Sequence, residues 1–440
     1  MNLQFIKNLG QGGFGKVDLV FDSDSSNNQI YAQKFFNSQQ TQLYDNFRRR
    51  FIREINVQSQ FNHPNIVPVI DTNLTSHPPY FLMPVANSTL TEDMNQPGFI
   101  PNNALFDILQ GLEEIHHKGY SHRDLKPDNI LRFDDGNGTS TYAISDFGLI
   151  DNGRDMTTLT ATGDAGGTPY YAAPELFQDL SRATHLCDIY SFGAILHDIY
   201  ATSRRTPGET LSAPGPIGNI ISKCTQRLPM RRYQSISEIR QDLYSALNSN
   251  YTQTAENYRI TEILSQPLPL NNDLWDEIFF VLEEVRNNNS KLHEIFKLIK
   301  YEHITDLAQN QGLPLLTSFT EIFTNFIINY AFDFNYCDIL ADKLLTLFTY
   351  SRNLFNDISL QASILLALLL LGVGHNRWYV ERKFATLASA SLDERVVDRL
   401  IFEANDKEIC LQDKIEHLLW SISLKLNSLH PRFSDYVQLR

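Results

Sequence analysis

Two strings of polar residues lie close together in the first half of the chain and carry the side chains best suited to catalysis. They are His122-Arg123-Asp124-Leu125-Lys126-Pro127-Asp128-Asn129 and Asp146-Phe147-Gly148. In such a loop an acid like Asp124 accepts a hydroxyl proton, Lys126 neutralises a moving phosphate and Asn129 holds a metal ion. Asp146 adds a second metal-binding carboxylate. Both strings, in this order and at this separation, predict phosphoryl transfer.

A glycine-rich segment near the start of the chain supplies the matching phosphate site. Its glycines are Gly10, Gly12, Gly13 and Gly15. Glycine lets backbone N–H groups approach phosphate oxygens without a Cβ in the way. Dinucleotide-binding folds use the same spacing, but there a helix follows the glycines. Here the segments 17–21 and 30–36 are strand-like and flank a run of turn residues, which predicts a β-hairpin and removes the dinucleotide alternative.

Further motifs follow in order along residues 1–248. They are Ala32-Gln33-Lys34, His63-Pro64-Asn65-Ile66-Val67 after a helical run containing Glu54, Gly167-Thr168-Pro169-Tyr170-Tyr171-Ala172-Ala173-Pro174-Glu175, and Asp188-Ile189-Tyr190-Ser191-Phe192-Gly193. With the catalytic strings, they make this region resemble the eukaryotic-type serine/threonine members of the protein kinase superfamily. The resemblance implies an α+β, bilobal protein kinase fold, with an N-lobe at residues 1–83 and a C-lobe at residues 87–248.

The resemblance also assigns a role to each site residue. Lys34 would bind the α- and β-phosphates of ATP and pair with Glu54. Asp124 would accept the substrate proton, Lys126 would stabilise phosphate charge, and Asn129 with Asp146 would hold Mg²⁺. The expected nucleotide contacts are Gly10, Gly12, Gly13, Gly15, Val17, Ala32, Lys34, Pro84, Ala86 and Leu131.

The substrate class follows from two positions. Lys126, in the D-x-K-P-x-N string, and Thr168, ahead of the Ala-Pro-Glu string, resemble serine/threonine-specific members. We therefore expect an enzyme that transfers the γ-phosphate of ATP to protein hydroxyls, with ATP and Mg²⁺ as cofactors. The resemblance further implies that Arg232 pairs with Glu175 and that Asp188 ties down the catalytic loop.

Two features bear on regulation. Gln58 stands where the family places an apolar residue, and a polar group there weakens the apolar column unless it finds a hydrogen bond. Our hypothesis is that the active helix position is only marginally populated, so Gln58→Leu should change basal activity. Arg123 implies a pocket for an activation-loop anion, supplied either by phosphorylated Thr160 or Thr162, which we favour, or by Asp164.

Two other functions remain open from the residues. A nucleotide-binding scaffold with vestigial phosphotransfer is disfavoured because Lys34, Glu54, Asp124, Asn129 and Asp146 are all intact. A phosphotransferase acting on a small molecule or on RNA is disfavoured by the complete segment before the Ala-Pro-Glu string, which forms a peptide-docking ledge in protein kinases.

Composition and charge indicate which partners and which cellular location to expect. The 440 residues carry a formal net charge of −14, which argues against nucleic acid or an anionic membrane as the main partner. Four cysteines without metal or disulfide spacing suit a reducing compartment. A strand predicted to start at residue 3 leaves no room for a signal peptide. We therefore expect a cytoplasmic location.

Beyond residue 248 the pattern changes. Residues 249–272 are rich in Asn, Gln, Ser and Pro and predict a linker. Residues 273–440 show apolar stripes at helical spacing, which predict an all-α domain of eight or nine helices, arranged as a bundle or a solenoid. The apolar run 362–373 is too short to span a bilayer and predicts a buried core helix.

The C-terminal half carries no catalytic constellation. His375 and Trp378 favour packing and capping rather than a site. From its position beside a kinase-like region, we expect a sensor, docking or oligomerisation module that binds a protein partner or a second copy of the chain.

Overall fold

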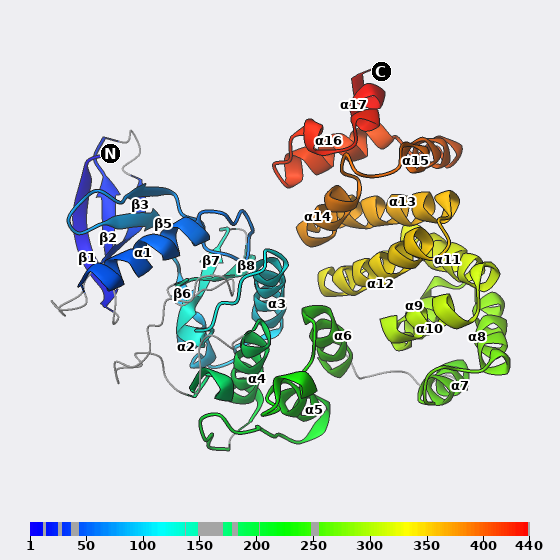
Figure 1. Cartoon of the computed structure of the whole chain (residues 1–440), viewed down its shortest axis with the longest axis horizontal. Helices are drawn as coiled ribbons and strands as arrows, with labels where there is room; N and C mark the ends of the chain where they lie inside the picture. Colours follow the sequence, from blue (N-terminus) through cyan, green and yellow to red (C-terminus); the bar gives the residue numbers. More distant parts are fainter. Residues whose placement is uncertain are drawn as a thin grey trace. The chain divides into compact units, whose positions relative to one another are not determined.

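The computed structural model describes residues 1–438 except 12–14, 25–28, 37–43, 137, 148–169, 178–183, 202 and 248–254. The described chain forms two compact units, Met1–Leu243 and Tyr244–Arg440 (Figure 1). Gly12 and Gly13 of the glycine segment, and the candidate phosphosites Thr160 and Thr162, lie outside the described residues.

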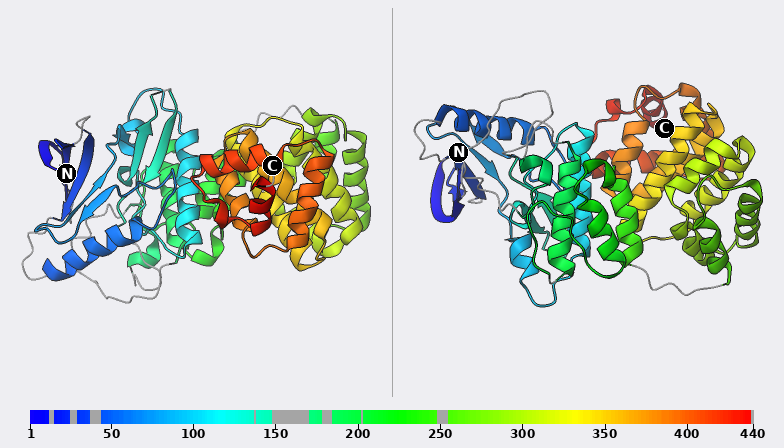
Figure 2. Two further views of the ribbon diagram at one scale, coloured as in Figure 1. Left: turned by 90° about the horizontal axis from the view of Figure 1, so that it is seen from above. Right: turned by 60° about the horizontal axis from the view of Figure 1, so that its bottom comes forward.

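The first unit begins with a five-stranded antiparallel sheet. Its order is β1 (Leu3–Gln11), β2 (Gly15–Asp22), β3 (Ile30–Phe36), β5 (Tyr80–Met83) and β4 (Asp71–Asn73). The antiparallel pairing of β2 with β3 confirms the predicted hairpin, and β1 pairs with β2 in the same way. Helix α1 (Tyr44–Gln58) lies along this sheet (Figure 2) and buries Phe51 and Ile55 against Phe36 and Phe81 of the strands.

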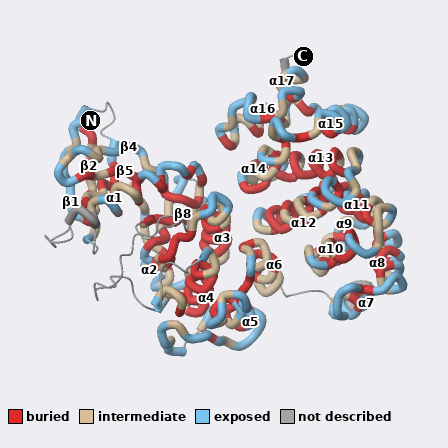
Figure 3. The backbone as a smooth tube through the Cα atoms, viewed as in Figure 1, coloured by how far each residue is buried: buried red, intermediate tan, exposed pale blue. Residues whose placement is uncertain are grey.

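The second lobe of this unit is mainly helical. A small sheet of β6 (Ser88–Thr89), β7 (Ile130–Asp134) and β8 (Ser140–Ile144) carries the catalytic strings at its ends. The helices are α2 (Leu90–Met94), α3 (Asn102–His117), α4 (Leu186–Tyr200), α5 (Gly215–Cys224) and α6 (Ile236–Leu247), with 3-10 turns η2 (Pro127–Asn129), η3 (Pro174–Phe177) and η5 (Pro229–Arg231). Residues 187–197 of helix α4 are all buried (Figure 3), so this helix forms the core of the lobe.

The second unit is all-α. Its helices are α7 (Ala255–Leu264), α8 (Asn272–Glu284), α9 (Asn289–Leu298), α10 (Tyr301–Asn310), α11 (Leu313–Ile328), α12 (Phe334–Asn353), α13 (Ile358–Gly374), α14 (Trp378–Leu387), α15 (Glu394–Asp406), α16 (Leu411–Ser421) and α17 (Pro431–Gln438). The described residues from 272 onward thus form ten helices, so the expected eight or nine was too few. Short helices such as α14 and α17 offer too few turns for a recognisable apolar stripe.

Helix α13 is the centre of the second unit. It packs against α11, α12, α14, α15 and α16 (Figure 1), and residues 364–369 are all buried. An apolar surface on every side fits a helix surrounded by other helices. The prediction of a buried core helix is confirmed. Within the described ranges, no helix combines the length and the apolar character needed to cross a membrane.

The stretch expected to be a linker contains ordered structure. Helix α7 lies within it and buries Ile260 and Ile263 against α8 and α9. The Leu270 N–H, at its end, donates to the buried Asp306 carboxylate at 3.1 Å. Two apolar residues three positions apart make a helical face that the polar composition around them conceals.

Candidate active site

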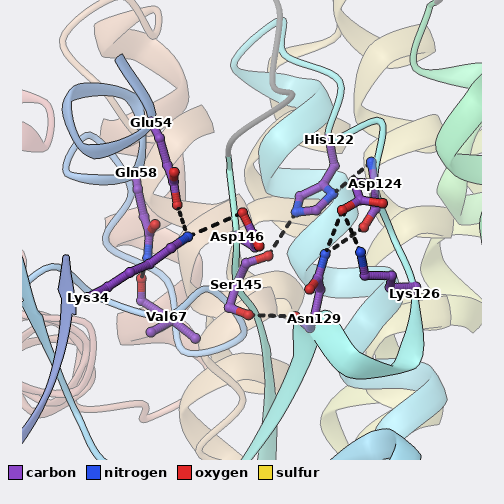
Figure 4. Close-up of polar contacts among 10 residues, drawn as sticks. All are labelled: Lys34, Glu54, Gln58, Val67, His122, Asp124, Lys126, Asn129, Ser145 and Asp146. Atoms are coloured by element: carbon purple, nitrogen blue, oxygen red, sulfur yellow. Dashed lines mark hydrogen bonds and ion pairs between the residues drawn. The ribbon is translucent and has the colours of Figure 1, made fainter. Parts of the chain in front are cut away.

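Lys34 lies at the meeting point of three elements of the first unit. Its Nζ, on β3, is 2.5 Å from Glu54 Oε1 on α1 and 3.3 Å from Asp146 Oδ1 after β8 (Figure 4). Asp146 adopts the left-handed backbone conformation, with φ of 64°, as residues at functional sites often do. The structure therefore brings together three residues that the sequence predicted for one site.

The charges around Lys34 are strongly coupled. Burial lowers the pKa of Lys34, but the carboxylates of Asp146 and Glu54 outweigh burial, and the net pKa is raised. Burial raises the pKa of Glu54 to about 7, against the opposing charge of Lys34. The pKa of Asp146 is lowered, since Lys34 and His122 outweigh its burial. Lys34 is thus a permanent cation that faces an ionised Asp146.

The first catalytic string forms a compact loop before β7. The Lys126 Nζ lies 2.8 Å from Asp124 Oδ2, and the Asn129 amide donates to the Asp124 carbonyl at 2.8 Å and to its Oδ2 at 3.2 Å (Figure 4). The Ser145 N–H and Oγ both bind the Asn129 carbonyl, at 2.8 and 2.9 Å. Ser145 therefore joins this loop to the segment that carries Asp146.

A buried carboxylate on α4 holds the same loop from behind. Asp188 accepts the backbone N–H groups of His122 at 2.9 Å and Arg123 at 2.8 Å, which confirms the expected tie. His116 Nε2 lies 2.8 Å from the same carboxylate. These contacts outweigh the effect of burial and lower the pKa of Asp188. Arg123 has φ of 69°, and its bonded N–H helps to hold that backbone in place.

The expected adenine contacts share one apolar cluster. Ala32 and Met83 are buried in it, and Val17 and Leu131 pack against it. Pro84 and Ala86 are half-buried in the segment between β5 and β6. The structure therefore places three of the expected nucleotide contacts, Val17, Ala32 and Leu131, around one apolar cluster.

Position 15 requires a glycine for steric reasons. A Cβ there would lie 2.9 Å from the Phe35 carbonyl oxygen and 3.4 Å from Lys34 Cε. No side chain fits beside Lys34 without displacing backbone. Gly10 has open space on its Cβ side. Gly15 thus keeps the backbone at the start of β2 free of a side chain next to Lys34.

Asp146 and Asn129 are the residues that could supply oxygen ligands to a cation. The Asn129 amide nitrogen is turned toward Asp124, so its side-chain oxygen is the atom left to meet a metal. Oxygen donors and a small number of protein ligands fit Mg²⁺, which retains waters and binds substrate phosphates. Among the described residues, no group of three His, Cys, Asp or Glu could hold a metal by itself.

Sequence reasoning missed one support residue near the site. The Asp93 carboxylate on α2 is buried and accepts bonds from Ser88 at 2.7 Å, Arg132 at 3.1 Å and Tyr142 at 2.7 Å. It links the segment after β5 to β7 and β8. Two of its partners, Arg132 and Tyr142, are distant in the sequence, and no local motif marks them.

The comparisons with known proteins agree with this geometry. A family model described as the protein kinase domain matches residues 3–266, which is more than half of the chain. The chain belongs to the protein kinase family. The match covers the sheet, the catalytic loop and the Asp188 and Arg232 motifs, and it ends within the second unit, before α8.

Curated relatives of this kinase include proteins of a plant and of bacteria. Cyclin-dependent kinase F-3 of Oryza sativa subsp. japonica is 31% identical over 208 residues, which is 46% of this chain and 45% of that protein. Serine/threonine-protein kinase PknD of Chlamydia felis is 26% identical over 325 residues, covering 60% of this chain and 34% of the relative. A probable serine/threonine-protein kinase of Clostridium acetobutylicum is 27% identical over 272 residues, 56% of this chain and 40% of the relative. The kinase thus spans less than half the length of each.

Proposed function

We propose that this chain is an ATP-dependent serine/threonine protein kinase. The observation that carries the proposal is the convergence of Lys34, Glu54 and Asp146 beside the loop that holds Asp124, Lys126 and Asn129 (Figure 4). These groups come from separate elements, and phosphoryl transfer needs this combination of positioned charges. The names of the relatives in Chlamydia and Clostridium support the serine/threonine class.

Each side chain has a defined task in the proposed reaction. Lys34 binds phosphate oxygens and is held in place by Glu54. Asp124 orients the substrate hydroxyl and accepts its proton, and Lys126, 2.8 Å from that carboxylate, places a positive charge where phosphate charge develops. Asn129 and Asp146 would hold Mg²⁺, which neutralises phosphate charge when bound. The protein contributes alignment and electrostatics rather than a covalent intermediate.

The adenine ring would lie in the apolar cluster. Val17 and Ala32 would cover one face and Leu131 the other, while the Pro84 carbonyl and the Ala86 N–H would bind the ring edge. Proline lacks an N–H but keeps its carbonyl acceptor, so Pro84 is compatible with this role. Gly10 and Gly15 would let backbone N–H groups approach the phosphates.

We also propose that the kinase phosphorylates its own loop at Thr160 or Thr162, and that Arg123 pairs with that phosphate. The helical domain, proposed to start at residue 273, would serve as a sensor or docking module for a protein partner or a second copy of the chain. The support is that it follows a kinase unit in the sequence.

Phosphosite mapping tests the proposal. Purified full-length protein is incubated with Mg-ATP and analysed by mass spectrometry, with Asp124→Ala as the inactive control. We expect phosphate on threonine or serine in the wild type and none in the variant, with Thr160 or Thr162 among the sites. Phosphate on serine or threonine elsewhere would keep the kinase proposal and reject the loop sites.

A different result would favour the scaffold function. If the wild type binds Mg-ATP, carries no phosphate and transfers none to a general protein acceptor such as casein or myelin basic protein, the catalytic proposal is wrong. The helical domain would then be the functional part, and the kinase unit would be a nucleotide-binding scaffold.

A further inference from the structure

A polar side chain one helical turn after Glu54 is buried and binds a backbone carbonyl. Gln58, the last residue of α1, is 1% exposed, and its Nε2 donates to the Val67 carbonyl at 2.7 Å (Figure 4). Residues four apart lie on the same helix face, so Gln58 and Glu54 approach the sheet side by side. The polar residue expected to weaken this face therefore has a hydrogen-bond partner.

Val67 connects this contact to the other carboxylate at Lys34. Its N–H donates to the Ile144 carbonyl at 2.9 Å, and the Ile144 N–H donates to the Asn65 carbonyl at 2.9 Å. Ile144 is the last residue of β8, two positions before Asp146. Val67 and Ile144 are both fully buried. A continuous path of hydrogen bonds thus runs from α1 through Val67 to the strand that leads to Asp146.

The Gln58–Val67 contact is directional and partly unsatisfied. In the described part of the chain, the Val67 carbonyl has no donor other than Gln58, and the buried Gln58 Oε1 has no hydrogen-bond partner. An apolar residue at position 58 would avoid the unpaired Oε1 but would leave the Val67 carbonyl without a donor. The glutamine therefore adds little to stability, but it selects one position and rotation of α1.

We propose that Gln58 is a positioning residue for phosphoryl transfer. By binding the Val67 carbonyl it ties the helix that carries Glu54 to the strand that leads to Asp146, so that both carboxylates meet Lys34. This inference rests on the proposed kinase activity. Gln58 makes a hydrogen bond with one correct geometry where an apolar side chain would make a non-directional contact. It acts on the positions of Glu54 and Asp146 rather than on the substrate.

The test compares four variants of the full-length chain in steady-state assays with Mg-ATP and a protein acceptor. Gln58→Leu and Gln58→Met remove the donor at similar volume. We expect kcat to fall by roughly tenfold in both, at unchanged KM for the protein acceptor, with unchanged thermal stability because one unpaired acceptor replaces another. Gln60→Leu, at an exposed glutamine just beyond α1, is the control and should match the wild type.

Gln58→Glu adds a readout that simple packing would not change. A protonated glutamate has one O–H that can donate to the Val67 carbonyl, whereas the carboxylate cannot donate and would add a second negative charge to the helix face that carries Glu54. We expect the ratio of its kcat to that of the wild type to rise as the pH falls.

The outcomes separate this inference from the proposed function. If the wild type transfers no phosphate, the kinase proposal fails and the inference fails with it. If the wild type is active and Gln58→Leu and Gln58→Met match or exceed its kcat, the positioning role alone is wrong. If both variants lose kcat and also unfold at a lower temperature than the wild type, the positioning role is wrong as well, because that result indicates a structural role.

Discussion

Arg232 holds Glu175 through two parallel N–H···O bonds, of 2.7 and 2.8 Å, in the second lobe of the kinase unit. The expected pairing is confirmed. The Arg232 guanidinium also donates to the carbonyls of Gln226 and Leu186 and is 2% exposed. A planar fork with several donors matches this set of acceptors, which a lysine ammonium cannot reproduce.

Arg232→Lys should therefore destabilise this lobe. Losing the fork leaves the half-buried Glu175 carboxylate and two carbonyls incompletely paired, at a cost of about 3 kcal/mol. Hydrogen-exchange mass spectrometry should show faster exchange in segments 170–177 and 226–233. Arg231→Lys, at the exposed neighbouring position, is the control. Unchanged exchange in Arg232→Lys would contradict the role of this pair.

Asp124→Asn should abolish most of the activity without unfolding the protein. The amide cannot accept the substrate proton, and general base catalysis contributes on the order of 10²–10⁴ in rate. We expect kcat to fall within that range, while Mg-ATP affinity and thermal stability stay close to the wild type. Asp135→Asn, in the β7–β8 turn, should keep full activity. A drop of less than about tenfold would argue against Asp124 as the base.

Glu54 should give the kinase an acidic limb in its pH–rate profile. Burial raises its pKa to about 7, and only the carboxylate attracts Lys34. Below about pH 7, kcat/KM should fall by up to tenfold per pH unit. Glu54→Gln should be less active and lack this limb. A limb that persists unchanged in the variant would show that another group controls it.

The same pKa shift has the opposite effect on stability. The folded state binds the Glu54 proton more readily than the unfolded chain, whose glutamate has a pKa near 4.5. The stabilisation is fully present below that pH and is lost as the pH rises through about 7. Between about pH 4.5 and pH 7, a rise in pH should therefore increase activity while the stabilisation from Glu54 is lost.

Lys343 predicts a pH-dependent stability of the second unit. Its Nζ, on α12, is buried and donates to the Phe296 carbonyl of α9 at 2.6 Å. Burial, with a smaller effect from Lys300 that exceeds the opposing effect of Asp342, lowers its pKa to about 7. Because the unfolded lysine binds its proton up to about pH 10.5, the free energy of unfolding should rise between about pH 7 and pH 10, by up to 1.4 kcal/mol per unit.

Tryptophan fluorescence measures this effect in the full chain. All three tryptophans, Trp275, Trp378 and Trp420, lie in the second unit, so urea unfolding followed by fluorescence monitors that unit. Lys343→Met should remove the slope, whereas Lys425→Met, at an exposed lysine, should keep it. An identical slope in Lys343→Met would show that the pH dependence has another origin.

The sequence alone determined the features that depend on local strings and their order. The catalytic loop, the Asp146 segment and the first hairpins are set by residues close together in the chain, so spacing and periodicity predict them. The Arg232–Glu175 pair also followed from ordered motifs. The apolar run of α13 predicted a buried helix for a similar reason, since an apolar surface on every side has only one stable environment in a globular protein.

Only the tertiary structure decided which distant groups meet. The bonds of Asp93 to Arg132 and Tyr142, the Gln58 bond to Val67 and the burial of Lys343 depend on the packing of separate elements. No local pattern encodes them, because a polar side chain has the same sequence signature in solvent and in a core. Helix α7 was also missed, because its two buried isoleucines lie in a polar stretch of sequence. Buried hydrogen bonds and shifted pKa values arise from the neighbours that folding supplies.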